Sequence, residues 1–103
     1  MRIKYLGVLA IALLVAPMAQ ASEELAKKNA CLACHQVDKK LIGPSYQDVA
    51  NKYKGDAAAH DLLVKKVKEG GVGVWGQVPM PPNPAVSDAD LNALVTWIMG
   101  MAK

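Results

Sequence analysis

The sequence has 103 residues, of which 20% are charged, and a formal net charge of +3. This length fits one small domain and excludes an enzyme with a separate substrate domain. The slight positive charge argues against nucleic acid as a partner, because binding to phosphates needs a strong basic surplus.

Residues 1–21 have the three parts of a secretory signal peptide. Arg2 and Lys4 give a positive start, an uncharged apolar run follows, and Ala19-Gln20-Ala21 supplies the small-x-small cleavage pattern. The apolar run is too short for a stable membrane span, although an uncleaved anchor is the alternative. We therefore expect cleavage after this pattern, a mature domain over residues 22–103, and a periplasmic protein without stable membrane insertion.

The expected mature domain has a thin core for its size. Residues 22–103 contain ten basic and nine acidic residues, two cysteines and no phenylalanine. Domains this small usually depend on disulfides, a metal or a large buried cofactor for stability. We therefore expect something other than side chains to fill the middle of the fold.

The first two helices of the mature domain are predicted from their capping residues. Ser22 is expected as an N-cap, and the helix after it would run into the cysteine segment. Ser45, with Asp48 three residues later, forms a capping-box arrangement, and Gly55 would end the helix that it opens. Apolar side chains follow at helical spacing within that helix, at Tyr46, Val49, Ala50 and Tyr53.

The last two helices flank an irregular segment. The third helix would open at Asp56 or Ala57 and end at Gly70-Gly71, with its lysines mostly solvated. Residues 70–86 are rich in glycine and proline and cannot form a regular element. The last helix would begin at Ser87 and bury a stripe formed by Leu91, Leu94, Val95 and Ile98. Since no segment has the pattern of a strand, the predicted fold class is all-α.

Cys31-Leu32-Ala33-Cys34-His35 is a C-x-x-C-H motif, the signature of covalent c-type haem attachment. Residues i and i+3 share a helix face, so one turn can present both thiols to the two vinyl groups of a haem. His35 would then supply the proximal iron ligand. The alternatives are a Cys31–Cys34 disulfide, a thioredoxin-like pair without its βαβ pattern, and a zinc site without its second ligand pair.

The second iron ligand is expected among His60, Met80, Met99 and Met101. The two last methionines lie at the end of a helix, where core packing is the ordinary role, and His60 has the polar neighbours of a solvated histidine. Met80 instead has proline on both sides, which fixes the backbone and positions a weakly binding thioether at little entropic cost. Met80 is therefore the predicted ligand, with the sealing of a hydrophobic gap as the alternative. Ligation by His and Met fills both axial sites and favours electron transfer.

Taken together, residues 22–103 resemble the small bacterial class I cytochromes c, in particular the cytochrome c-551 and c-552 group. The resemblance rests on the C-x-x-C-H motif and on three further blocks, Gly43-Pro44-Ser45-Tyr46, Gly73-Val74-Trp75-Gly76 and Val78-Pro79-Met80-Pro81-Pro82-Asn83. It implies the class I cytochrome c fold, in which terminal helices pack together and short helices and loops surround one covalent haem c. It also implies an electron-transfer protein and not an enzyme.

The resemblance implies a role for each site residue. The haem would be held by two thioethers and two axial ligands, from Cys31, Cys34, His35 and Met80. The Pro44 carbonyl would accept a hydrogen bond from the His35 ring and so orient it. The Trp75 indole N–H would donate to a haem propionate, and the Asn83 side chain would approach the Met80 sulfur. A plain core tryptophan and a turn residue are the alternatives for Trp75 and Asn83.

Two departures from the resembled group are visible. Some members have phenylalanine in the first helix, where this chain has Leu25 and Ala26, so that the haem wall would be looser there. The segment at residues 83–87 is one residue longer than in the shortest members. This difference bears on how firmly Asn83 and Met80 are held.

The resemblance also implies redox partners and a monomeric carrier. Members of the group exchange electrons with a quinol-oxidising cytochrome complex, nitrite reductase, peroxidase or terminal oxidase. Transient redox contacts are small and steered by charge, and four lysines flank the haem-attachment segment, Lys27, Lys28, Lys39 and Lys40. The rival functions are a haem enzyme or sensor, which needs an open axial site, and a structural zinc or disulfide module.

Overall fold

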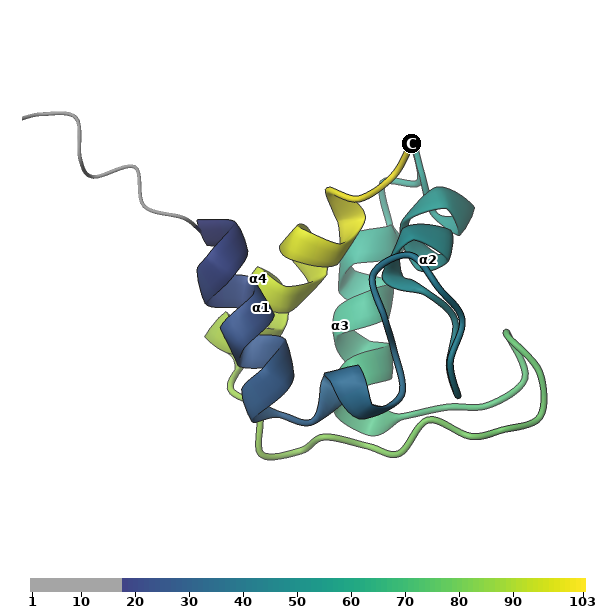
Figure 1. The fold of residues 1–103 in the computed structure, drawn as a ribbon, viewed down its shortest axis with the longest axis horizontal. Coiled ribbons are helices and arrows are strands. Elements are labelled where there is room, and N and C mark those ends of the chain that lie inside the picture. The colour runs from purple at the N-terminus through teal and green to yellow at the C-terminus, as the bar shows by residue number, and fades with distance from the viewer. Residues whose placement is uncertain (1–17) are drawn as a thin grey trace, which may run out of the picture.

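The computed structural model describes residues 18–103, so most of the signal peptide that the sequence predicts lies outside the described residues. Within this part the chain forms four α-helices and one 3₁₀ turn, namely α1 (Met18–Lys28), η3 (Cys31–Ala33), α2 (Tyr46–Lys52), α3 (Ala59–Glu69) and α4 (Asp88–Met99) (Figure 1). The described residues contain no strand, only an isolated antiparallel bridge between Gly71 and Met80. The all-α prediction is confirmed. None of the helices in residues 18–103 is long and apolar enough to cross a membrane.

Helix α1 begins earlier than the capping residue predicted. It starts at Met18, so Ser22 lies inside the helix and is buried, and its prediction as an N-cap is wrong. The residues before it include alanine and glutamine, which are strong helix formers and extend the helix toward the N-terminus. The helix also stops before the cysteine segment, because Ala30 takes a left-handed conformation with φ 61°. A separate 3₁₀ turn therefore presents the two cysteines.

The capping residues of α2 and α4 are confirmed. The Ser45 hydroxyl accepts a hydrogen bond from the Asp48 amide at 3.0 Å, and the Ser87 hydroxyl accepts one from the Asp90 amide at 3.1 Å. Each bond satisfies one of the free N–H groups in the first turn of its helix. Both helices begin directly after their serine, as the sequence predicts.

Helix α3 begins at Ala59, slightly later than the sequence predicted. The carboxylate of Asp56 accepts a hydrogen bond from the Ala58 amide at 2.9 Å, and this contact forms a turn ahead of the helix. The helix ends before Gly70, whose φ of +76° stops it as predicted. The C-terminal end of α3 therefore leads directly into the irregular segment at residues 70–86.

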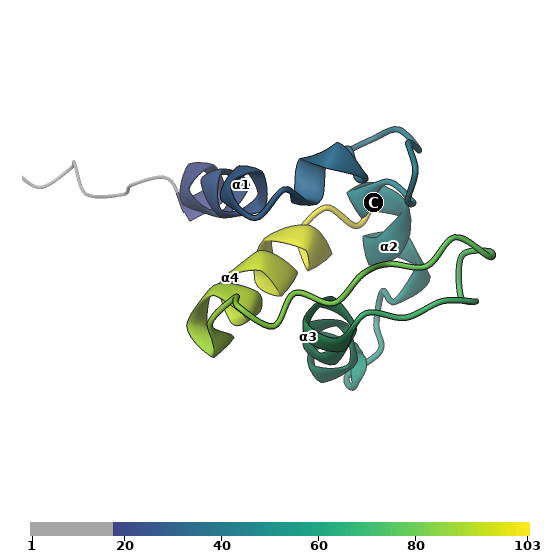
Figure 2. The ribbon, with the colours of Figure 1, turned by 90° about the horizontal axis from the view of Figure 1, so that it is seen from below.

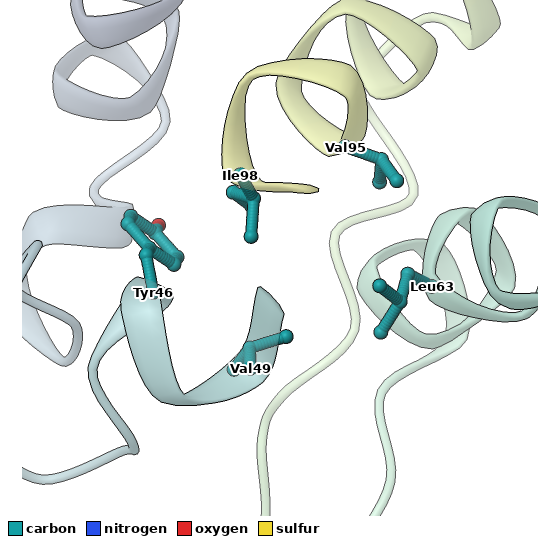
Figure 3. Packing of buried hydrophobic residues seen from close by; sticks show 5 residues of the cluster. All are labelled: Tyr46, Val49, Leu63, Val95 and Ile98. Carbon is teal, nitrogen blue, oxygen red and sulfur yellow. The ribbon is translucent and has the colours of Figure 1, made fainter. Parts of the chain in front are cut away.

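Three helices bury their apolar faces in one cluster. Tyr46 and Val49 come from α2, Leu63 from α3, and Val95 and Ile98 from α4. Figure 3 shows these five side chains arranged around a common space between the three helices. All five of these residues also line the pocket in which the candidate site lies.

The terminal helices pack together, as the resemblance implied. Helix α1 lies against α4 through a second buried cluster, formed by Ala26, Val86, Leu91 and Leu94 (Figure 2). Ala26 is completely buried and Leu25 packs against this cluster, in the stretch where the resemblance implied phenylalanine in some members. The predicted apolar stripe of α4 is divided between the two clusters.

The segment between α3 and α4 has no regular structure, as predicted. It leaves the end of α3, extends away from the helices as a long loop, and returns to α4 (Figures 1 and 2). Gly71 and Met80 exchange two backbone hydrogen bonds, at 3.1 Å and 2.8 Å, where the two arms of this loop meet. The hydrogen bonds between Gly71 and Met80 therefore close the base of the loop, and the residues between them extend away from the helices.

Candidate functional site

A large pocket brings all of the predicted site residues except Asn83 to one place. It lies between α2, α3, α4 and two loops, and the empty space in it, including the part open to solvent, amounts to about 1140 Å³. Its walls are mainly apolar and include core side chains from the helices, among them Leu63, Leu94, Val95 and Ile98.

One wall of the pocket is formed by residues 31–46, here called the proximal segment. The turn at Cys31–Ala33 is closed by hydrogen bonds to the Cys31 carbonyl, from the Cys34 amide at 3.1 Å and from the His35 amide at 3.0 Å. Cys31, Cys34 and His35 all line the pocket. A tight turn thus directs two sulfurs and one imidazole to the same space.

Both cysteines are free thiols and both are partly buried. Burial raises the pKa of the Cys31 thiol, which therefore stays protonated at neutral pH. Since the thiols are free, the structure gives no support to the disulfide alternative. The zinc alternative also fails within residues 18–103, because no group of three histidine, cysteine or acidic side chains is close enough to hold a metal ion.

The His35 imidazole is fixed on three sides. Its Nδ1 lies 2.7 Å from the Pro44 carbonyl oxygen, and its ring stacks on Tyr46 with centroids 4.9 Å apart and an interplanar angle of 18°. On the remaining side a Cβ atom on Gly43 would lie only 2.8 Å from His35 Cε1. A carbonyl can only accept, so Nδ1 carries the proton and Nε2 keeps its lone pair for a metal.

The contact to Pro44 is the one that the resemblance implied, whereas two of the three supports were not assigned from the sequence. Gly43 and Tyr46 were quoted only as parts of a motif and of a helix face. A glycine directly before the predicted acceptor Pro44 could have indicated a close approach to the His35 ring.

The opposite wall contains residues 70–83, here called the distal loop. Met80 is partly buried and lines the pocket. Its backbone N–H and carbonyl both form hydrogen bonds with Gly71, which lies close to the end of α3. Gly70 packs so tightly against this loop that a Cβ atom there would lie 2.5 Å from the Met80 carbonyl oxygen. The methionine is thus anchored through its backbone to a helix end.

Asn83 holds the distal loop from its other end. Its side-chain Nδ2 donates to the Val67 carbonyl at 3.0 Å and to the Pro81 carbonyl at 3.2 Å. Its backbone amide is bonded to carbonyls in the last turn of α3, including that of Val67. Both amide hydrogens of the side chain are therefore used on backbone carbonyls, and the expected approach to the Met80 sulfur stays a prediction.

Trp75 lies in the outer part of the distal loop. It lines the pocket, and 44% of its surface is exposed. Its ring lies near the ammonium of Lys52 from α2, which is 5.7 Å from the ring centroid. The indole is therefore neither a plain core residue nor detached from the pocket.

The pocket also includes a lysine that the sequence analysis placed in solvent. Lys66 of α3 is partly buried and lines the pocket, and a Cβ atom on Gly71 would lie 3.0 Å from its Nζ. The solvated prediction is correct for Lys65 and for Lys68, which forms an exposed ion pair with Asp88 at 3.2 Å. The position of Lys66, three residues after the buried Leu63, was the available signal.

The remaining candidate ligands lie outside the pocket. The Nε2 atom of His60 is 2.7 Å from Asn92 Oδ1, on the exposed side of α3 and α4. Met99 and Met101 pack against the buried cluster, in the ordinary role that the sequence favoured. Among the methionines of the described chain, the one that lines the pocket is Met80.

Comparisons with known proteins agree with this geometry. The cytochrome c family model matches residues 19–102. Cytochrome c-551 of Allochromatium vinosum is 60% identical, over 87% of this chain and 96% of that protein. Cytochrome c-552 of Nitrosomonas europaea is 56% identical, over 96% of this chain and 97% of that protein. The crystal structure of the latter superimposes with a TM-score of 0.75 at 53% identity, covering 77% of this chain and 98% of that one. The chain belongs to the cytochrome c family, in the group of the small cytochromes c-551 and c-552 that carry electrons on one covalent haem c.

Proposed function

We propose that this chain is a periplasmic carrier of single electrons whose haem iron is held by His35 and Met80, and that it shuttles electrons between respiratory redox partners. The observation that carries the proposal is the pocket itself. Its proximal wall holds two free thiols and an imidazole, and its distal wall holds a thioether.

The side chains of the proximal wall fit a c-type haem. Cys31 and Cys34 would form the two thioether bonds, and Nε2 of His35 is the nitrogen left for the iron, because Nδ1 faces the Pro44 carbonyl. A bound haem supplies a one-electron couple at its iron. The protein keeps the imidazole in one orientation through Gly43, Pro44 and Tyr46, which limits reorganisation when the charge of the site changes.

The distal wall fits the second half of the site. Met80 supplies a soft thioether, a ligand type that raises the potential of a haem with a histidine on the other side. Because Asn83 donates to the Pro81 carbonyl, we propose that it positions Met80 through the backbone. Lys66 and Trp75 both line the pocket, and their N–H groups would donate hydrogen bonds to the propionates of a haem.

The N-terminal segment supports the proposed periplasmic location. The sequence of residues 1–21 supports export with cleavage, which would leave residues 22–103 as the mature carrier. The residues that the cytochrome c family model matches, 19–102, include almost all of that mature part. Mass spectrometry of protein purified from a periplasmic extract tests this part of the proposal, with an N-terminus at Ser22 as the expected result.

The proposed docking surface surrounds the loop after the haem-attachment segment. Three apolar side chains are exposed there, Val37, Leu41 and Ile42, and the neighbouring lysines Lys39 and Lys40 are exposed as well. A partner such as a quinol-oxidising cytochrome complex, nitrite reductase, peroxidase or terminal oxidase would meet an apolar patch with a basic rim.

One of the four lysines expected at this surface, Lys27, lies close to acidic side chains. Lys27 lies 3.6 Å from Glu24 and 3.9 Å from Glu23, so its charge is partly compensated. Reversal of Lys39 and Lys40 to glutamate is expected to slow electron exchange with an acidic partner, more at low than at high ionic strength. The same reversal at Lys27 is expected to have a smaller effect, and equal rates for all variants at low salt would refute the surface.

The iron ligands are tested by optical spectra of the holoprotein and two variants. Ferric wild type should show the weak sulfur-to-iron charge-transfer band, and its reduced form should bind carbon monoxide poorly. Met80→Ala should lose the band and bind carbon monoxide readily, while the control Met99→Ala should behave like wild type. A band that persists in Met80→Ala would contradict the ligation.

A further inference from the structure

Lys52 lies between two aromatic rings at the edge of the pocket. Its Nζ is 5.7 Å from the centroid of the Tyr53 ring and 5.7 Å from that of the Trp75 ring. Both rings line the pocket. A lysine ammonium within about 6 Å of an aromatic centroid is attracted by the negative face of the ring. The contact therefore links the last turn of α2 to the distal loop.

The outer part of the distal loop, residues 72–78, has few other attachments. In the described chain its backbone hydrogen bond is internal, from the Gly73 amide to the Gly76 carbonyl at 3.0 Å. Figures 1 and 2 show how far this part of the loop extends from the helices. The contact between Lys52 and the Trp75 ring therefore joins this part of the loop to α2, where no backbone hydrogen bond of the described chain does.

The charge of Lys52 is not used in an ion pair within the described residues, where the ion pairs formed by lysines involve Lys27 and Lys68. Lysine in the last turn of a helix is also a common response to the helix dipole. That role alone would need no ring beside the ammonium, whereas here two rings from different segments flank it.

We propose that Lys52 is a positioning residue, which fastens the outer part of the distal loop to α2 by holding the Trp75 ring. The base of the loop is held separately, by the bonds between Gly71 and Met80. Lys52 therefore fixes Trp75 without fixing the iron ligand. The consequence for electron transfer rests on the proposed function, because it assumes that Trp75 stands beside the haem. Removing a nearby positive charge would then favour the ferric form and lower the potential.

The test compares three variants of the ferrous holoprotein. Lys52→Met keeps the length of the side chain without its charge, Lys52→Arg keeps the cation, and Lys65→Met removes an exposed lysine of α3 as a control for net charge. Amide hydrogen exchange of residues 72–78 is measured by NMR, together with the reduction potential. We expect exchange to be about two- to five-fold faster in Lys52→Met, with a lower potential and with unchanged exchange at Gly71 and Met80. Lys52→Arg should restore both values, and Lys65→Met should change neither the exchange nor, appreciably, the potential.

Three results would overturn the inference. These are wild-type exchange in Lys52→Met, equally fast exchange in Lys65→Met, and no rescue by Lys52→Arg. The sulfur-to-iron band of the wild type separates this inference from the proposed function. Absence of that band would refute the ligation by Met80 whatever the exchange rates are, and an intact band with unchanged exchange would refute only the role of Lys52.

Discussion

The two walls of the haem pocket are held by different kinds of contact. In the proximal segment His35 is fixed by residues close to it in sequence, through the Cys31 carbonyl, the Pro44 carbonyl and the Tyr46 ring. In the distal loop Met80 is fixed by the end of a helix, through Gly71 and through the bonds of Asn83. A local clamp can persist while the surrounding structure opens, whereas an anchored loop depends on each of its anchors. We therefore expect the methionine side of the site to open before the histidine side.

The largest effect is expected at the anchor of the distal loop. Gly70→Ala would place a Cβ atom 2.5 Å from the Met80 carbonyl oxygen, at a residue with a φ of +76°. Backbone strain and the clash together should lower the free energy of unfolding by about 2–4 kcal/mol. The sulfur-to-iron band should weaken, since the loop must shift. Denaturant titration and ferric spectra measure both effects.

Gly55→Ala is the matched control for that variant. Gly55 has a similar φ of +80°, but a Cβ atom there would have no neighbour within 4 Å. It should cost only the strain of the backbone, about 1 kcal/mol, and leave the band unchanged. Equal losses in both variants would show that the packing of Gly70 against the loop is unimportant.

A smaller effect with a different signature is expected in the proximal segment. Gly43→Ala would place a Cβ atom 2.8 Å from His35 Cε1, and overpacking of this kind costs about 1–3 kcal/mol. NMR of the ferric protein should show changed chemical shifts for the His35 ring, and thermal unfolding measures the loss of stability. In the control Gly100→Ala the new Cβ would meet ordinary contacts, the nearest at 3.4 Å, and stability should stay close to wild type. Unchanged NMR signals of the His35 ring in Gly43→Ala would refute the role of Gly43 in fixing the imidazole.

The next effect concerns the hydrogen bonds of Asn83. Asn83→Ala removes donors to the Val67 and Pro81 carbonyls, at 3.0 Å and 3.2 Å. The two bonds together should contribute about 1–2 kcal/mol, and added imidazole should displace Met80 from the ferric iron faster. Asn83→Asp keeps the shape of the side chain but cannot donate hydrogen bonds. Imidazole should therefore displace Met80 in Asn83→Asp as fast as in Asn83→Ala. Displacement at the wild-type rate in Asn83→Asp would show that the donated bonds do not hold the loop.

The smallest effect is expected outside both walls. Asn51 Oδ1 accepts from the backbone amide of Lys103 at 2.7 Å, and Lys54 Nζ lies 3.1 Å from the Lys103 carbonyl oxygen. The first of these exposed contacts joins the chain end to α2, and the second joins it to the turn that follows α2. Asn51→Ala should lower the free energy of unfolding by about 0.5–1 kcal/mol in a thermal melt and leave imidazole binding unchanged. Faster displacement of Met80 in this variant would mean that the distal loop responds to stability in general and not to its own anchors.

The parts of the fold that depend on neighbouring residues could be predicted from the sequence. Ser45 and Ser87 cap their helices through bonds to residues three positions away, so their pattern is visible in the chain itself. The geometry of the attachment motif could be predicted for the same reason, since Cys31, Cys34 and His35 belong to one turn. Ser22 failed because the cap was placed at the expected start of the mature chain, while the helix extends back to Met18.

The contacts between distant segments could not be predicted in this way. The packing of Gly70 on Met80 joins residues ten positions apart, across a loop with no repeating pattern. The position of Lys66 in the pocket depends on where α3 meets that loop, and one of the two rings beside Lys52, that of Trp75, comes from a separate segment. The proline pattern around Met80 indicated a rigid loop, but not the helix end to which it is anchored.

The central claim is that the Met80 sulfur and the His35 nitrogen hold the same haem. The most direct measurement is NMR of the reduced holoprotein with ¹³C-methyl-labelled methionine, with Met80→Leu used to assign the signal. Because a methyl group on an axial sulfur lies over the porphyrin ring, the ring current should move the Met80 signal far upfield of those of Met99 and Met101. If the signal of Met80 appeared among the ordinary methionine signals, the iron would have another ligand and the account would be contradicted.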